Sequence, residues 1–159
     1  MVTMLLKSIS KVMKRHPRHI TIDGRRWTQR YFSGVSDKQQ RVSELIKRRR
    51  TPYSKLSLGP SNIGIRTQKS KWTLLFHKVY PDLKFDKNLI AQRTGIPRAS
   101  LNTVYDRGLK AWKTSGSRPG ATAAQWAVAR VYKFVLVSKK KAPEAWYRTK
   151  FDPNNNLRH

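Results

Sequence analysis

Residues 89–104 have the residue types and spacing most typical of nucleic-acid recognition in this chain. Their sequence, LIAQRTGIPRASLNTV, predicts two short helices that meet at a tight turn containing Gly95. Ala91 lies four positions before that glycine, where two helices approach closely, and this is the arrangement of a helix-turn-helix. In such a pair the second helix enters the major groove, where Arg and Asn form bidentate contacts with base edges. The polar residues expected to face DNA or an acidic partner are Arg98, Ser100, Asn102, Thr103 and Arg107.

A helical hairpin without a DNA-binding role fits the same stretch. Its apolar residues are Ile90, Ile96, Leu101 and Val104, at positions where either kind of helix pair needs contacts. Both interpretations therefore stay open at this point.

The charge of the chain points to anionic partners. The 159 residues include 35 Lys and Arg but only 8 Asp and Glu, which gives a net charge of +27. Each third of the chain is basic, so we expect nucleic acid, an acidic protein surface or an anionic membrane to lie against it. The densest runs are expected to contact such a partner, although solvated helix ends would look the same. These runs are Lys47, Arg48, Arg49 and Arg50, and Lys139, Lys140 and Lys141.

The sequence predicts neither an enzyme nor a metal or cofactor site. Cysteine is absent, and the eight acids are scattered. The closest pair, Asp82 and Asp86, is better explained by loop and helix-capping roles. His16 and His19 have no neighbouring cluster of metal ligands. The chain also lacks a glycine-rich phosphate loop and a nucleophile elbow.

The elements that must position these residues are mainly helices. Asp23-Gly24 predicts a type I′ hairpin in which Ile20 faces Trp27. Capping residues and apolar spacing then predict five helices. They begin at Ser36 with Gln39, at Ser70, at Asp86, at Pro97 and at about Thr122, and end at about Arg49, Pro81, Gly95, Trp112 and Val137.

The two ends of the chain and one central stretch are expected to project from this helical body. Residues 2–13 predict an amphipathic basic helix, which could pack on the protein, lie on a membrane surface or act in targeting. Residues 51–69 predict a long loop or arm. Trp146 and Tyr147 lie in a predicted extended tail, where they would anchor a partner.

We therefore expect a mainly α fold in three parts. Residues 1–30 form an arm with the amphipathic helix and hairpin, residues 31–138 form the helical domain, and residues 139–159 form a basic extended tail. We expect no transmembrane segment and no secretory signal.

Three stretches within residues 31–138 resemble a known protein family. They are Tyr31-Phe32-Ser33-Gly34, the stretch 69–73 with Phe76 and Tyr80, and the stretch 107–131, in which Arg118-Pro119-Gly120 leads into Gln125-Trp126-Ala127. Together they resemble small basic proteins encoded by large nucleocytoplasmic DNA viruses, including those of algae. The resemblance implies a viral setting in the virion and supplies no catalytic residues.

The leading functional expectation is a non-enzymatic minor capsid protein of such a virus. It would bridge or cement capsid units through its basic surface and extended arms. Its partners would be the major capsid protein and other minor capsid proteins, with viral DNA or the inner membrane surface as further contacts. The alternatives are a helix-turn-helix protein that binds or condenses viral DNA, and a membrane-surface protein acting through residues 1–15.

Overall fold

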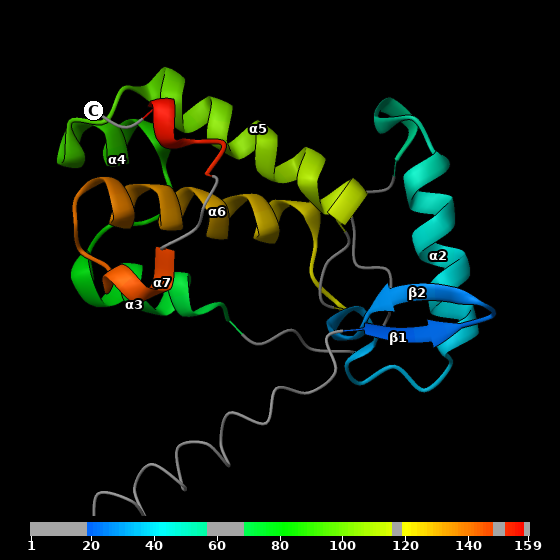
Figure 1. Ribbon diagram of the computed structural model, residues 1–159. Coiled ribbons are helices and arrows are strands. Elements are labelled where there is room, and N and C mark those ends of the chain that lie inside the picture. The colour runs from blue at the N-terminus through cyan, green and yellow to red at the C-terminus, as the bar shows by residue number, and fades with distance from the viewer. Residues whose placement is uncertain (1–18, 57–68, 116–118, 148–151, 158–159) are drawn as a thin grey trace, which may run out of the picture.

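A computed structural model describes residues 19–56, 69–115, 119–147 and 152–157 of the chain. The helix expected over residues 2–13 and most of the loop expected over residues 51–69 lie outside the described residues. The described part is mainly α, as predicted, with six α-helices and one two-stranded sheet. Figure 1 shows the sheet and helix α2 at one end of the molecule and helices α3 to α7 at the other.

The predicted hairpin is present. Strands β1 (His19–Ile22) and β2 (Arg25–Thr28) pair antiparallel, with Ile20 opposite Trp27 as predicted. Asp23 and Gly24 have φ angles of 49° and 72°, the left-handed values that a type I′ turn requires at both central residues. The pairing places Ile20 and Trp27 on one face, which two strands alone could not keep from water.

That face packs against α2 (Lys38–Arg50) and forms the smaller of two cores. A short 3-10 helix, η1 (Gln29–Phe32), follows β2 and adds aromatic rings. The buried residues of this core are Trp27, Tyr31, Phe32, Val42 and Leu45. The core thus joins the hairpin to α2 across the boundary expected at residue 30.

Helix α2 begins one residue later than predicted. Its N-cap is Asp37, whose carboxylate accepts a hydrogen bond from the backbone N–H of Gln40 at 3.0 Å. The prediction that Ser36 and Gln39 form a capping box is therefore wrong. A carboxylate also interacts favourably with the helix dipole, which a serine hydroxyl does less well.

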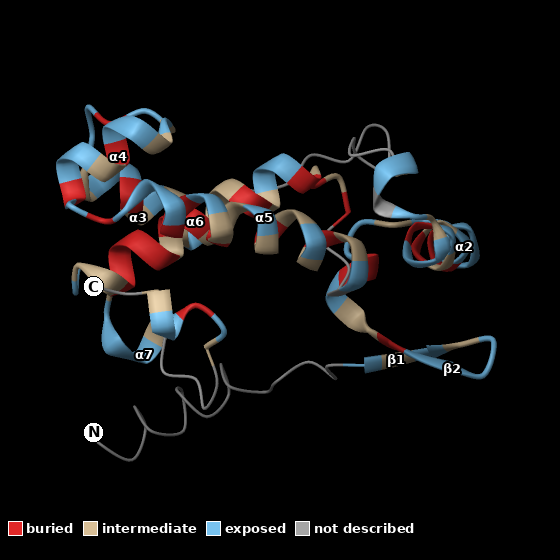
Figure 2. Ribbon diagram, turned by 90° about the horizontal axis from the view of Figure 1, so that it is seen from above, coloured by how far each residue is buried: buried red, intermediate tan, exposed pale blue. Residues whose placement is uncertain are grey.

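The larger core is built around α6 (Ala123–Ser138), as the nearly continuous apolar sequence of that helix predicted. Helices α3 (Lys71–Val79), α4 (Lys87–Thr94) and α5 (Arg98–Ser115) complete it. The buried residues follow the side of each helix that faces its neighbours (Figure 2). Ser70 and Asp86 cap α3 and α4, and Thr122 forms a capping box with Gln125.

The closest helix pair is α5 against α6. Gly108 lies where they meet, and a Cβ atom built there would be 2.6 Å from the Cα of Ala127. Only glycine allows this approach without a shift of the backbone. Helix α5 continues to Ser115, three residues beyond the predicted end at Trp112.

The C-terminal segment is not the extended tail that we expected. It contains α7 (Glu144–Tyr147) and a 3-10 helix, η3 (Asn155–Leu157), and a further 3-10 helix, η2 (Tyr53–Lys55), follows α2. Trp146 contacts Trp72 edge to face, with ring centroids 5.4 Å apart, and Leu157 packs against the larger core. The tail prediction is wrong where the structure describes the segment, because these apolar side chains find partners within the chain. No helix in the described ranges has the length and apolar content needed to cross a bilayer.

Candidate nucleic-acid interface

The helix pair predicted over residues 89–104 is present as α4 and α5. Gly95 ends α4 with a φ of 72°, and its N–H donates to the carbonyl oxygen of Ala91 at 2.8 Å. The apolar residues named above are fully or almost fully buried; they are Ile90, Ile96, Leu101 and Val104. The buried contacts between the two helices fix the position of the first turn of α5.

Two of the predicted reading residues face outward from that turn. The side chains of Arg98 and Asn102 are exposed and lie one helical turn apart. Thr103 is half-buried, and its hydroxyl donates to the carbonyl oxygen of Ala99 at 3.0 Å. Asp106, the next residue on the exposed face, forms an ion pair with Lys110 at 2.8 Å. A carboxylate there repels phosphate, so the surface suited to DNA is short.

The prediction that Ser100 faces a partner is wrong. Ser100 is 6% exposed because it lies one turn before Val104 and shares the buried face of α5. Its spacing of four residues from Val104 was the sequence signal for this burial.

Arg107 is half-buried and already engaged within the chain. Its guanidinium donates to the carbonyl oxygen of Pro153 at 2.6 Å and to the side-chain oxygen of Asn154 at 3.0 Å. It therefore holds the C-terminal segment against α5, which sequence spacing did not indicate. Arg130 donates to the carbonyl oxygen of Arg107, and burial lowers the pKa of Arg130, with the nearby charge of Arg107 adding to that shift.

Three residues of the first basic run face outward and one does not. Lys47, Arg49 and Arg50 are exposed at the end of α2. Arg48 is 5% exposed; its guanidinium lies 3.9 Å from the ring centroid of Trp112 and donates to the carbonyl oxygen of that residue at 3.4 Å. Burial is the main cause that lowers the pKa of Arg48 to about 10. The expectation that Arg48 contacts a partner is wrong, because this side chain packs between α2 and α5.

The second basic run and the tail aromatics lie beside α6 and α7. Lys140 and Lys141 are exposed, whereas Lys139 is half-buried as the C-cap of α6. Trp146 packs on Trp72, so the prediction that it lies in an extended tail is wrong. The side chain of Tyr147 lies outside the described structure.

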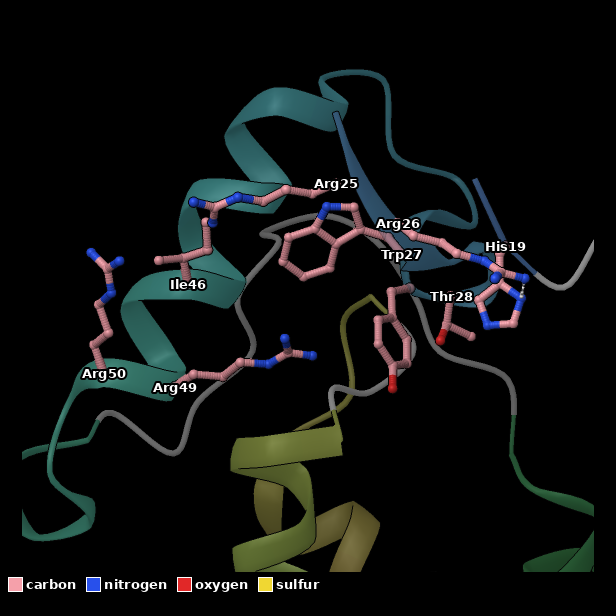
Figure 3. A pocket seen from close by; sticks show the side chains of 9 residues that line it. His19, Arg25, Arg26, Trp27, Thr28, Ile46, Arg49 and Arg50 are labelled. Carbon is pink, nitrogen blue, oxygen red and sulfur yellow. Dashed lines mark hydrogen bonds between the residues drawn. The ribbon is translucent and has the colours of Figure 1, made fainter. Parts of the chain in front are cut away.

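One basic site was missed by the sequence analysis, and it lies between the hairpin and α2. We call it the arginine cavity: a space of about 560 Å³ at which four arginines and five other residues meet (Figure 3). Its lining residues are His19, Arg25, Arg26, Trp27, Thr28, Tyr31, Ile46, Arg49 and Arg50. The signal in the sequence was Arg25-Arg26 directly after the hairpin turn. These two arginines form a site only together with the end of α2, and the sequence does not show that the hairpin packs against that helix.

Metal binding has no support among the residues that the structure describes. No group of three or more His, Cys, Asp or Glu lies together within these ranges. The carboxylates instead serve as caps or ion-pair partners, such as Asp86 for α4 and Asp82 for Arg93.

Comparison with known proteins gives a family and no function. A family model matches residues 28–158, which cover most of the chain. The chain belongs to a family of unknown function, DUF5824. Neither the curated proteins nor the solved structures contain a match. The family match includes α2 to η3 and begins at the last residue of β2, so Arg25 and Arg26 precede it whereas Arg49 and Arg50 lie within it.

Proposed function

We propose that the protein is a non-enzymatic structural protein of a large DNA virus particle that binds viral DNA through the phosphate backbone. The observation that carries this proposal is the excess of cations on the folded chain. Ten of the 35 Lys and Arg residues lie outside the described ranges, so 25 remain there together with all eight acids. At least 17 of these cations therefore have no carboxylate to pair with one to one.

The acids are also occupied within the chain. Those that cap a helix, pair with a cation or accept a hydrogen bond include Asp23, Asp37, Glu44, Asp82, Asp86, Asp106 and Asp152. The positive charges of a surface with so few negative charges repel each other unless a polyanion lies against that surface. DNA presents a phosphate about every 1.7 Å of helix axis and releases counterions when Lys and Arg neutralise it.

The arrangement of the helix pair favours backbone binding over sequence reading. Arg98 and Asn102 face outward, but Ser100 is buried and Arg107 holds the C-terminal segment. Two outward residues followed by the carboxylate of Asp106 make a small base-reading surface. Positioning contacts to phosphate need only cations and no particular base sequence.

A minor capsid protein that cements capsid units is the second candidate. Leu74 and Leu89 are 58% and 47% exposed on α3 and α4, and a capsid partner would cover these apolar side chains. The partners would then be the major capsid protein and other minor capsid proteins. The tail aromatics no longer favour a bridging arm, since Trp146 packs within the chain.

Fluorescence anisotropy with two unrelated DNA duplexes tests the proposed function. We expect the full chain to bind both with similar dissociation constants at low salt and to bind neither tightly at high salt. Failure to bind either duplex at low salt would exclude the proposal. Quantitative mass spectrometry of purified particles separates the two candidates: a DNA-bound protein is lost from particles emptied of DNA, whereas a capsid cement stays with the shell.

A further inference from the structure

We propose that the arginine cavity is a phosphate-binding site that holds a phosphodiester segment between the hairpin and α2. The inference deepens the proposed function and rests on it for the identity of the polymer, DNA. The site itself is argued from the lining residues. Arg25 and Arg26 come from β2, and Arg49 and Arg50 come from the last turn of α2.

The lining of the cavity contains positively charged side chains and no negatively charged ones. None of the nine lining residues has a carboxylate, and none of the four arginines forms an ion pair with an acid in the described part of the chain. The other polar side-chain groups at the cavity are the imidazole of His19, the indole N–H of Trp27 and the hydroxyls of Thr28 and Tyr31, which are able to donate hydrogen bonds. An anion placed beside Arg25 and Arg49 reduces the repulsion between their positive charges.

Two of the guanidinium groups are held in place by neighbouring rings. Arg49 lies over the ring of Trp27, 5.2 Å from its centroid, and Arg26 lies 3.2 Å from Nδ1 of His19. Figure 3 shows Arg25 and Arg49 extending from β2 and α2 into the space around the Trp27 ring. Arginines that are already oriented lose less conformational freedom when they bind phosphate in the bidentate manner that their planar shape favours.

Trp27 supplies a second, independent observation. Its side chain is only 6% exposed and lines the cavity, yet the indole Nε1–H has no hydrogen-bond acceptor within the described residues. Buried donors are normally satisfied. An oxyanion in the cavity would supply an acceptor for this indole N–H.

The size of the cavity favours a segment of polymer over a single ion. A volume of about 560 Å³ lies within the range of sites that hold ligands of nucleotide size or larger. The cavity is also open to solvent, so a DNA strand is able to enter and leave it. We therefore assign it to a stretch of DNA backbone that contacts guanidinium groups from both elements.

The test compares two charge-removing double variants of the full chain. Arg25→Gln/Arg49→Gln removes two charges from the cavity, and Lys78→Gln/Lys84→Gln removes two exposed charges elsewhere. We expect the cavity variant to weaken binding to a short DNA duplex by about tenfold or more and the matched variant to weaken it by less than about threefold. Equal losses would overturn the inference, because they would show that only net charge matters.

A charge-preserving variant separates geometry from charge. Arg25→Lys/Arg49→Lys keeps both charges but removes the planar groups, and we expect it to lose most of the affinity that the glutamine variant loses. Affinity equal to that of the unmodified chain would contradict a bidentate phosphate site. If the double variants fail to fold, the single variant Arg49→Lys gives the same comparison.

Nuclear magnetic resonance provides a measurement that does not depend on the net charge of the protein. The indole N–H signal of Trp27, assigned with Trp27→Phe, should shift when inorganic pyrophosphate or the duplex is added, whereas that of the buried Trp112 should not. No shift at Trp27 with either probe would overturn the inference. Binding of duplex without any effect of the cavity variants would overturn the site but leave the proposed function. Binding of pyrophosphate at Trp27 without duplex binding would overturn the proposed function but leave the phosphate-binding site.

Discussion

Arg48 shows how a residue in a charged run can act as a structural element. Its neighbours Lys47 and Arg49 are exposed, but Arg48 lies between α2 and α5, stacked on the buried ring of Trp112. The indole N–H of Trp112 donates to the carbonyl oxygen of Ala121 at 3.0 Å, which fixes the ring that Arg48 covers. The contact thus holds α2 against α5.

We expect Arg48→Lys to lower the free energy of unfolding by about 1–2 kcal/mol, because a desolvated cation–π contact contributes about 2 kcal/mol and lysine cannot stack as a planar group. Urea denaturation followed by circular dichroism measures the change. The control Arg50→Lys, at an exposed position of the same helix, should change it by less than about 0.5 kcal/mol. Equal stability of the two variants would show that the stack does not hold α2 against α5.

At the scale of elements, the packing of α5 on α6 depends on one glycine. Gly108 is buried, and an added Cβ would meet both the Cα of Ala127 at 2.6 Å and its Cβ at 3.1 Å. Because the nearest atom belongs to the backbone, the two helices would have to move apart.

Gly108→Ala should therefore destabilise the protein by about 1–3 kcal/mol, although alanine favours a helix more than glycine does. In thermal unfolding this corresponds to a decrease in Tm of roughly 2–10 °C for a chain of this size. The exposed control Asn102→Ala on the same helix should leave Tm nearly unchanged. A Tm for Gly108→Ala at or above that of the unmodified protein would contradict the close packing described here.

The first turn of α5 gives a second prediction for an element, this time for binding. If α5 contacts the DNA backbone, Arg98→Ala should weaken binding to unrelated duplexes to the same extent and reduce the salt slope by about 1. Asn102→Ala should change affinity little, because an amide contributes no charge. Anisotropy titrations of both variants on two duplexes measure this. Loss of preference for one duplex in Asn102→Ala would instead indicate base reading.

The elements could be predicted from sequence where the signals are local. Ser70 and Asp86 cap the helices they were expected to cap, and Asp23-Gly24 forms the expected turn, because these interactions span only a few residues. Asp37 was missed since Ser36 offered a competing cap one position earlier.

The site could be predicted only in part, because its decisive contacts join distant residues. Arg48 meets Trp112 across 64 positions, and Trp146 meets Trp72 from the far end of the chain. Neither contact follows from charge or periodicity. The arginine cavity likewise needs the hairpin and the end of α2 to be placed side by side, which their separate patterns do not specify.

For the whole molecule, the account predicts a binding mode set by charge. The described residues form two cores linked through α2 and α5, with basic side chains exposed on helices and strands of both. Few carboxylates remain to compensate them. Such a molecule should contact several phosphates at once and distinguish poorly between DNA sequences.

The dependence of DNA affinity on salt concentration tests this central claim most directly. For two unrelated duplexes, log Kd should rise linearly with the logarithm of salt concentration, with a slope of about 5 or more, because each neutralised phosphate contributes about 0.9. The two duplexes should give the same slope and similar affinities. A slope near zero, or strong preference for one duplex that persists at high salt, would contradict a protein that holds DNA by its backbone.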